Sequence, residues 1–201
     1  MSETRTTGAT PLDPDEAEGL IPTHVTTREE LNRLEQENIV EAMQGLNTSR
    51  PQSILDEGFI RKLHRQMFGR VWKWAGKFRT SDKNIGVPKA HIGVELHKLC
   101  EDIKAQIEHK SYPPDEIAWR FHHRLVSIHP FPNGNGRHAR LVTDLLLERV
   151  LHQPPFTWGG MSGVPQGEVR AAYLDALRAA DKSDYNKLAE FARLAQQSRK
   201  D

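Results

Sequence analysis

Hydrophobic residues recur every three or four positions along most of this chain, which is the period of an α-helix that buries one face. In residues 56–76 the pattern predicts a helix that ends at Gly76. Its core-facing residues are expected to be Phe59, Ile60, Leu63, Met67 and Phe68. In residues 26–43, Thr27 and Glu30 have the spacing of a capping box. The helix that follows is expected to bury a stripe formed by Leu31, Leu34, Asn38, Ile39 and Met43.

The same periodicity predicts helices through the second half of the chain. Residues 95–107 bring together Leu96, Leu99, Cys100, Ile103 and Ile107. Pro114 or Asp115 is expected to open a helix that runs to Ile128, because proline suits a first helical turn. Further helices are predicted from about Arg137 to Leu151, over residues 168–181 and over residues 184–197.

Residues 77–92 have a different pattern. Short β-favourable pieces are interrupted by Gly86 and Pro88, which indicates an extended flap or a hairpin. The chain shows no internal repeat. The sequence therefore predicts a mainly α fold, a helical bundle with one small β-hairpin flap.

Composition narrows the range of functions. Of 201 residues, 37% are hydrophobic and 27% are charged, which is enough apolar material for the core of one domain. The 28 Lys and Arg nearly balance the 27 Asp and Glu, so the net charge is only +1. Nucleic-acid-binding proteins usually carry a basic excess, and we therefore expect no direct contact with nucleic acid.

Cys100 is the single cysteine, so no disulfide can form within the chain, as is typical of proteins in a reducing cytoplasm. Its place in a helical apolar stripe indicates a buried core residue and not a nucleophile. No apolar run is long enough to cross a bilayer, and the chain does not begin like a signal peptide. We expect a cytoplasmic protein with no membrane contact.

The stretch Ser127–Val142, SIHPFPNGNGRHARLV, lies between two predicted helices and carries polar residues that packing does not require. The first N–H groups of a helix lack internal partners and carry partial positive charge. Gly134 and Gly136 would let phosphate oxygens approach that backbone closely. Arg137 and Arg140 share one face of the helix and can fork onto further oxygens. The loop is therefore a candidate polyphosphate site.

His129 stands at the entrance of this loop and titrates near neutral pH. A neutral imidazole beside a bound phosphoryl group can accept a proton from an incoming hydroxyl. The end of the preceding helix favours the protonated ring, whereas nearby arginines favour the neutral one, and the sequence leaves that balance open. Each feature alone also has a structural explanation, as a glycine turn, a capping histidine or solvated arginines. Their occurrence together favours chemistry.

Residues 129–140, HPFPNGNGRHAR, resemble the signature of the Fic/Doc family, His-Pro-Phe-x-(Asp/Glu)-Gly-Asn-(Gly/Lys)-Arg-x-x-Arg. LHRQMFGRVWKWAGKFRTSDKNIG is similar to the upstream helix and flap of that family, and RFHHRLVSIHPF to the helix that leads into the motif. The resemblance implies a Fic domain over residues 50–195, preceded by an N-terminal extension with one helix over residues 1–49. PLDPDEAEGLIP resembles the mobile mystery protein B subgroup, which is associated with mobile elements and a neighbouring helix-turn-helix protein.

The resemblance implies transfer of AMP from ATP to a Ser, Thr or Tyr hydroxyl of a target protein, with Mg²⁺ as the metal. It makes His129 the general base and assigns nucleotide binding to Gly134, Asn135, Gly136, Arg137 and Arg140. In these assignments Arg137 grips the outer phosphates and Arg140 orients the γ-phosphate. The flap that aligns the target segment would carry Lys83, Asn84 and Ile85.

One position departs from the family pattern. Asn133 stands where the family has an acidic metal ligand. An amide oxygen can still coordinate Mg²⁺ but contributes no charge, so weaker metal binding and slower turnover are expected. Gly136 resembles the nucleotidyl-transferring members, whereas the phosphorylating Doc branch carries Lys at that position.

Many relatives are restrained by a helix that bears Ser/Thr-x-x-x-Glu-(Gly/Asn), whose glutamate pairs with the second motif arginine. SILDEG, Ser53–Gly58, fits the letters but opens a core helix. RLEQEN, Arg33–Asn38, lies on the separate N-terminal helix and suggests an inhibitory contact between Glu37 and Arg140. The alternative is that Glu37 is an ordinary surface residue.

Two other functions stay open. The chain can be a catalytically quiet or partner-inhibited nucleotide-binding component of a mobile-element or toxin–antitoxin-like module, which Asn133 favours, or a Doc-like phosphotransferase. A metal hydrolase is disfavoured, because no H-E-x-x-H occurs and the adjacent His122 and His123 point to different helix faces.

Overall fold

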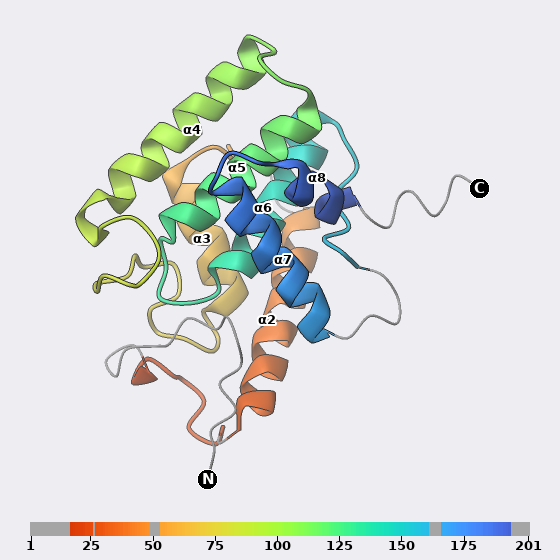
Figure 1. Ribbon diagram of the computed structural model, residues 1–201. Coiled ribbons are helices and arrows are strands. Elements are labelled where there is room, and N and C mark those ends of the chain that lie inside the picture. The colour runs from red at the N-terminus through yellow and green to blue at the C-terminus, as the bar shows by residue number, and fades with distance from the viewer. Residues whose placement is uncertain (1–16, 26, 49–52, 161–165, 194–201) are drawn as a thin grey trace.

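The computed structural model describes residues 17–25, 27–48, 53–160 and 166–193. Within these ranges it contains seven α-helices (Figure 1), which are α2 (Arg28–Thr48), α3 (Glu57–Phe68), α4 (Ile92–Glu108), α5 (Pro114–Ile128), α6 (Asn135–Leu146), α7 (Gln166–Ala180) and α8 (Asn186–Arg193). A short 3₁₀ turn, Lys89–His91, precedes α4, and a π turn, Leu147–Leu151, follows α6. The predicted mainly α fold is confirmed.

Helices α5 and α6 form the centre of the bundle. α5 packs against α4, α6 and α8, and α3 packs against α2, α4 and α6. In Figure 1, α4 runs along the upper edge, α2 extends from the lower part and α7 crosses in front. The connection between α5 and α6 therefore lies where elements from both ends of the chain meet.

The apolar faces predicted from the sequence build two clusters. The larger one contains the inward positions of α3, with Ile60, Leu63 and Met67 fully buried, together with Ile92 and Leu96 of α4. The smaller one lies under α7 and α8, around residues Phe156, Trp158, Tyr173 and Phe191. Cys100 is buried, and burial raises the pKa of its thiol to about 11, which agrees with a core residue.

Helix α3 is shorter than its apolar pattern suggests. Asp56 caps its start by accepting a hydrogen bond from the Phe59 N–H at 3.1 Å. The helix ends at Phe68 and not near Gly76, and the Gly69 N–H bonds the Arg65 carbonyl at 2.7 Å. The residues beyond it leave the helix because Val71 and Lys73 exchange backbone hydrogen bonds with the segment 19–21, through one isolated β-bridge between Leu20 and Trp72.

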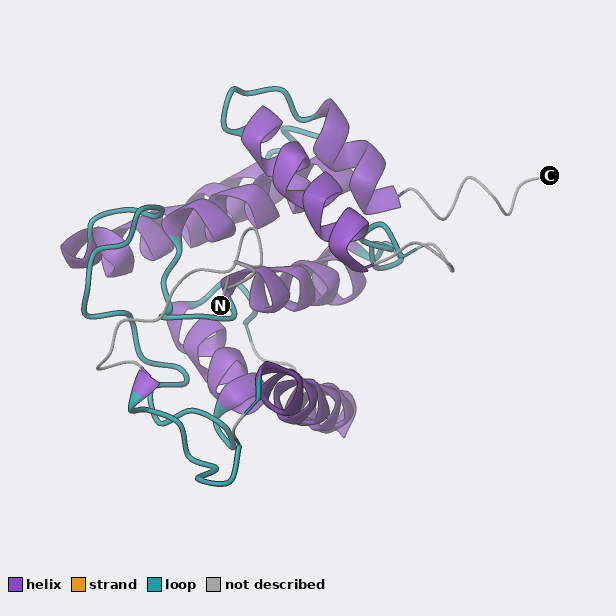
Figure 2. Ribbon diagram, turned by 60° about the horizontal axis from the view of Figure 1, so that its bottom comes forward, coloured by secondary structure: helices purple, strands orange, loops and turns teal. Residues whose placement is uncertain are grey.

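No strand is found between α3 and α4, where the sequence predicts a hairpin (Figure 2). The backbone groups of this segment bond side chains and the α5–α6 loop instead of an opposing arm. The Lys89 N–H, for example, donates to Asp82 Oδ1 at 2.7 Å, and the Lys89 ammonium donates to the Thr80 carbonyl. We call residues 77–88 the flap, which is an irregular loop.

Helix α2 begins with the predicted capping box, in which Thr27 and Glu30 exchange reciprocal hydrogen bonds of 3.2 Å. Its buried face contains Asn38 and Ile39 as predicted, with Leu31 and Leu34 packed against the core. Met43 is instead 47% exposed, and Glu35, which was not predicted, is buried.

Asn38 can be buried because its side-chain amide is hydrogen-bonded at the contact with α3. Its Nδ2 donates to the Gln66 carbonyl, and its Oδ1 accepts from the Arg70 N–H. The side of α2 that faces the bundle is therefore mainly apolar, with Ile39, Ala42 and Leu46 in the core, and includes the two polar residues Glu35 and Asn38.

Helix α6 begins at Asn135, two residues before the predicted start, and passes into the π turn instead of continuing to Leu151 as α-helix. The early start places Gly136 within the first helical turn and Gly134 at the N-cap. None of the described helices has the length and apolar character to cross a membrane.

Candidate active site

The connection between α5 and α6 reverses the chain within six residues, 129–134. His129 follows the last residue of α5 with φ 52° and ψ 60°, in the left-handed region. Gly134 caps the start of α6 with φ 78°. A Cβ at Gly134 would lie 2.6 Å from the Phe68 ring, so only glycine fits both the dihedral angle and the space.

The side chain of Asn135 closes this loop. Its Oδ1 accepts from the Phe131 N–H at 3.0 Å, and its Nδ2 donates to the Phe131 carbonyl at 2.8 Å. Asn135 is buried, and Phe131 is fully buried in the main core. The amide side chain therefore holds the loop and is not available to a ligand, whereas the Asn135 backbone N–H is.

His64 of α3 supports the loop from below, a role that sequence reasoning did not assign. Its Nε2–H donates to the Asn133 carbonyl at 3.0 Å and its Nδ1 accepts from the Gly76 N–H at 3.0 Å. Its ring stacks on Phe131 with centroids 3.7 Å apart. Burial and then His138 hold the pKa of His64 well below its ordinary value, so the ring is neutral.

The start of α6 presents unused backbone donors. Within the described residues, the first amide of the helix to find an acceptor is His138, which bonds the Gly134 carbonyl at 2.9 Å. No hydrogen bond described for the chain is donated by the backbone of Asn135, Gly136 or Arg137. These three N–H groups carry the partial positive charge of the helix end, so they form a cradle for an anion.

Arg137 is not free to meet such an anion. Its Nη2 lies 2.7 Å from Oε2 of Glu35, a residue of α2 that is only 3% exposed. The other carboxylate oxygen of Glu35 accepts from Trp72 Nε1 at 2.6 Å. The guanidinium also lies over the Phe68 ring, 5.0 Å from its centroid. The N-terminal helix thus occupies one of the two motif arginines.

The expected contact between Glu37 and Arg140 is not present. Glu37 is exposed and lies 3.7 Å from Arg33 on the outer face of α2. Glu35, one helical half-turn earlier, faces inward and pairs with Arg137 instead. The two glutamates are separated by two positions, which places them on opposite sides of a helix, and only packing against α3 decides which side is buried.

Arg140 makes no ion pair within the described part of the chain. Its guanidinium lies over the Tyr173 ring at 5.2 Å, and the Tyr173 hydroxyl lies 3.0 Å from His122 Nε2. Burial and Arg140 lower the pKa of His122 to about 3. Arg140 is half-buried with its charge still unpaired there, which suits it to a further phosphate oxygen.

His129 is only 5% exposed, yet both of its ring nitrogens lack a hydrogen-bond partner in the described structure. Burial, then Arg79, then Lys83 lower its pKa to about 4, so the ring is neutral at physiological pH. Gly86 of the flap lies against it, and a Cβ at Gly86 would lie 2.8 Å from the His129 Cβ. An unpartnered buried imidazole is costly in a folded protein and is typical of functional sites.

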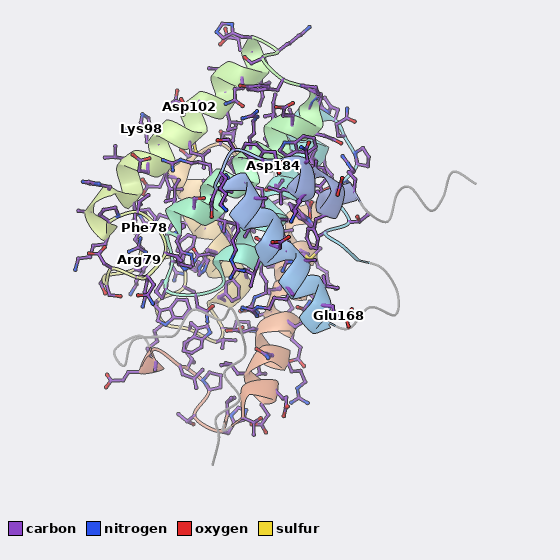
Figure 3. All side chains as sticks on the ribbon, viewed as in Figure 1. Phe78, Arg79, Lys98, Asp102, Glu168 and Asp184 are labelled. Carbon is purple, nitrogen blue, oxygen red and sulfur yellow. The ribbon has the colours of Figure 1, made fainter. Side chains whose placement is uncertain are left out.

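The residues predicted to dock a target belong to the irregular loop 77–88. Lys83 is half-buried, and Asn84 and Ile85 are exposed, Ile85 by 53%. Arg79, which sequence reasoning did not single out, is a buried arginine at the base of the same flap (labelled in Figure 3) and donates to the His129 carbonyl at 2.7 Å. An exposed apolar side chain therefore stands on a segment that is anchored beside His129.

The residues around Asn133 offer little to a metal ion. The Asn133 Oδ1 accepts from the Gly134 N–H at 2.7 Å, and the described residues contain no cluster of three or more His, Cys, Asp or Glu. A protein-only Mg²⁺ site does not fit here, because Mg²⁺ prefers several oxygen ligands and usually carboxylates. The Asn133 side-chain oxygen could at most add one neutral ligand to a Mg²⁺ ion whose other ligands are phosphates and water.

The site as a whole brings together a neutral imidazole, a backbone anion cradle and two arginines within residues 129–140. Such a set can bind a polyphosphate and remove a proton from a nucleophile beside it. Against this geometry, residues 54–147 match the family model described as "Fic/DOC family". The chain carries a Fic domain.

Curated relatives of this Fic domain are named protein adenylyltransferase Fic. The protein from Aedes aegypti is 29% identical over 136 residues, which is 66% of this chain and 26% of the relative. The protein from Drosophila melanogaster is 30% identical over 155 residues, which is 75% of this chain and 30% of the relative. The chain thus spans less than a third of the length of either relative.

Solved Fic structures share the fold. A fragment of Fic-1 from C. elegans has a TM-score of 0.64 and 25% identity, and the match covers 88% of this chain and 51% of that one. BepC from Bartonella tribocorum, solved with bound AMPPNP, has a TM-score of 0.65 at 16% identity, over 89% of this chain and 96% of that one. These likenesses agree with the observed helical bundle.

Proposed function

We propose that this Fic domain transfers AMP from ATP to a Ser, Thr or Tyr hydroxyl of a target protein. The observation that carries the proposal is the pairing of an unpartnered neutral imidazole, His129, with three unused amides at the start of α6. The names of the curated relatives support the same activity. The imidazole and the amides, which both lack hydrogen-bond partners in the described structure, lie at the two ends of one short loop. This arrangement suits a base for the nucleophile at one end and a binding site for the leaving phosphates at the other.

In the proposed step, His129 accepts the proton of the target hydroxyl as the hydroxyl oxygen attacks the α-phosphorus. The bond between the α-phosphorus and the bridging oxygen breaks, and pyrophosphate leaves. The amides of Asn135, Gly136 and Arg137 stabilise the negative charge of the phosphates, and Gly134 lets the loop reach them. The neutral state of the ring supports this role, because an imidazolium cannot accept a proton.

Arg137 and Arg140 are proposed to bind the outer phosphates, Arg140 at the γ-phosphate. Arg140 is unpaired among the described residues, whereas Arg137 must first leave Glu35. We propose that Glu35 restrains nucleotide binding, in place of the Glu37 contact expected from the sequence. The buried hydrogen bond that Trp72 Nε1 donates to the Glu35 carboxylate holds it in the position where it meets Arg137.

The target segment is proposed to dock on the flap at Lys83, Asn84 and Ile85. Both His129 ring nitrogens are covered, and Gly86 lies directly against the residue. The target must therefore displace flap atoms from the ring before its hydroxyl can reach the base. Exposed Ile85 offers the apolar contact that binding of a target segment can use.

Mg²⁺ is proposed to enter with ATP and to be held by phosphates, water and the Asn133 side-chain oxygen. When bound, it would offset phosphate charge. One neutral oxygen that already bonds the Gly134 N–H is a poor metal site by itself. A cytoplasmic location and a helix-turn-helix partner stay predictions.

Incubation with ATP labelled at the α- or the γ-phosphate tests the proposal. Wild-type protein should transfer label from the α position to protein, and His129→Ala should lose at least about 100-fold of that rate, the usual contribution of a general base. Both proteins should bind a non-hydrolysable ATP analogue, because the cradle does not include the imidazole. Label from the γ position only would contradict AMP transfer and indicate a phosphotransferase. No label with intact ATP binding would indicate a quiet nucleotide-binding component.

A further inference from the structure

Arg79 is a fully buried cation, with a side-chain exposure of 0%. Its Nε donates to the His129 carbonyl at 2.7 Å, its Nη1 to the Ser81 carbonyl at 2.8 Å and its Nη2 to the Val87 carbonyl. The carboxylate beside it, Asp82, is 3.5 Å away and 62% exposed. A buried charge is costly unless it is hydrogen-bonded, and the partners of this one are mostly carbonyls.

The flap bonds three successive carbonyls around His129. The Val87 N–H donates to the Ile128 carbonyl at 3.3 Å, the Arg79 side chain bonds the His129 carbonyl, and the Arg79 N–H donates to the Pro130 carbonyl at 3.0 Å. His129 has a positive φ, which a non-glycine residue adopts only when its surroundings hold it there. The bond from Val87 before the residue, and the two bonds from Arg79 at and after it, provide that restraint.

The position of Arg79 also settles the electrostatic balance that the sequence leaves open. Unpaired carbonyls at the end of α5 favour a protonated ring. The guanidinium of Arg79 donates a hydrogen bond to the carbonyl of His129 and places a positive charge beside the imidazole. The charges that act on the ring are Arg79 and Lys83, both from the flap, and each lowers the His129 pKa in addition to burial.

We propose that Arg79 is a positioning residue for His129, which holds the backbone of the base in its left-handed conformation and keeps the imidazole in the neutral, proton-accepting form. This inference rests on the proposed function in that it assigns His129 the role of base. It adds a residue outside the loop motif, 50 positions earlier in the chain, on which that role depends.

A purely structural role would also explain a buried arginine, because Arg79 fastens the flap. The two roles differ in charge. If Arg79 only fastens the flap, Arg79→Gln and Arg79→Lys should raise the proton affinity of His129 to the same extent, because burial is the largest cause of its low pKa and both variants loosen the flap. If it sets the state of the ring, removing the charge raises that affinity, since an uncompensated helix end then faces the imidazole.

Titration of the His129 imidazole by NMR, in protein labelled with ¹⁵N-histidine and free of nucleotide, separates the roles without requiring activity. His129→Gln assigns the signal. Arg79→Gln should raise the pKa by at least about one unit, a tenfold change in proton affinity, and Arg79→Lys, which keeps the charge, should move it by less than half as much. An Arg79→Gln pKa within about 0.3 unit of wild type, or within about 0.3 unit of Arg79→Lys, overturns the proposal.

Transfer rates of Arg79→Lys provide the second measurement, which stands even if Arg79→Gln does not fold. A lysine keeps the charge but cannot bond three separated carbonyls at once. We expect kcat to fall at least about tenfold at pH 8, with KM for ATP within about twofold of wild type, because the cradle lies on α6. A wild-type kcat in Arg79→Lys overturns the positioning role.

Arg70→Gln is the matched control, since Arg70 is 69% exposed and pairs with Glu41 away from the loop. It should alter neither the titration nor the rate. If the wild-type protein transfers no AMP, the proposed function fails, yet the titration still decides whether Arg79 controls the state of His129. The two failures are therefore distinguishable.

Discussion

The two ends of the α5–α6 loop are built in opposite ways. At His129 the backbone is bonded by the flap, and the ring is left without a partner. At Asn135 the side chain is bonded twice to Phe131, and the described structure offers the backbone N–H no acceptor. At each end the group that the fold leaves unused is the group that the proposed chemistry needs.

This contrast shows how a rigid loop can still present reactive groups. The bonds that fix the two ends of the loop use atoms that the proposed chemistry does not require, such as the His129 carbonyl and the Asn135 side-chain amide. Support comes from α3 through His64 and from the flap through Arg79. A site that is preorganised in this manner gives up little conformational freedom when it binds its ligand.

The largest expected effect comes from filling the α6 end of the loop. Gly134→Ala should lower the free energy of unfolding by about 2–4 kcal/mol, because its positive φ disfavours alanine and its Cβ would meet Phe68 at 2.6 Å. Gly136→Ala is the control within the same helix turn, since its Cβ would lie 3.5 Å from the Tyr173 hydroxyl, an ordinary contact. Urea unfolding measures both. Equal stability of the two variants would contradict the assigned geometry.

A second test compares the unused ring of His129 with the bonded ring of His122. His122→Leu should cost about 1–3 kcal/mol at pH 7.5, because it leaves the buried Tyr173 hydroxyl without its partner, whereas His129→Leu should cost less than about 1 kcal/mol. A larger loss in His129→Leu would mean that the ring has a structural partner.

The same two histidines predict an acid-sensitive fold. Their folded-state pKa values, about 4 for His129 and about 3 for His122, lie below the ordinary value near 6.5. Between those limits the unfolded chain binds protons that the folded chain does not, so the free energy of unfolding should fall as pH falls from 6.5 to 4. Each leucine variant should flatten part of that slope in urea titrations at pH 7.5, 6 and 5. An unchanged slope would contradict burial of neutral rings.

Release of Arg137 should have a smaller effect. Glu35→Gln keeps an acceptor for Trp72 but removes the charge opposite Arg137, and we expect ATP to bind about fivefold more tightly, which corresponds to about 1 kcal/mol. Glu37→Gln, an exposed change on the same helix, should leave the Kd unaltered. Calorimetry with a non-hydrolysable analogue measures both. Equal affinities in the two variants would mean that Glu35 does not restrain the site.

The smallest expected change is at Asn133. Asn133→Asp adds a charged oxygen beside the cradle, and the Mg²⁺ concentration for half-maximal AMP transfer should fall about threefold. Asn84→Asp, on the exposed flap, controls for the added charge. A half-maximal concentration unchanged in Asn133→Asp would show that this position does not contact the metal.

Much of the site could be predicted from local patterns. The order His129, Gly134, Asn135, Gly136, Arg137 and Arg140 between two apolar stripes indicated a phosphate cradle with a base, because helix ends and glycine have the same physics in any fold. The predicted hairpin was wrong because its formation depends on contacts far along the chain. The flap has β-favourable residues, but its backbone bonds are taken by Arg79 and by the 128–130 carbonyls, which no local pattern reveals.

The sequence by itself determined the helical periods, the capping box at Thr27 and the loop between α5 and α6, since these depend on neighbours within a few residues. Only the tertiary structure decided that Glu35 and not Glu37 meets a motif arginine, and that Arg79 lies under His129. Those contacts join residues about 50 to 100 positions apart, and packing of whole helix faces selects them. The charged residues that lie beside Arg137 and His129 could therefore be identified only from the fold.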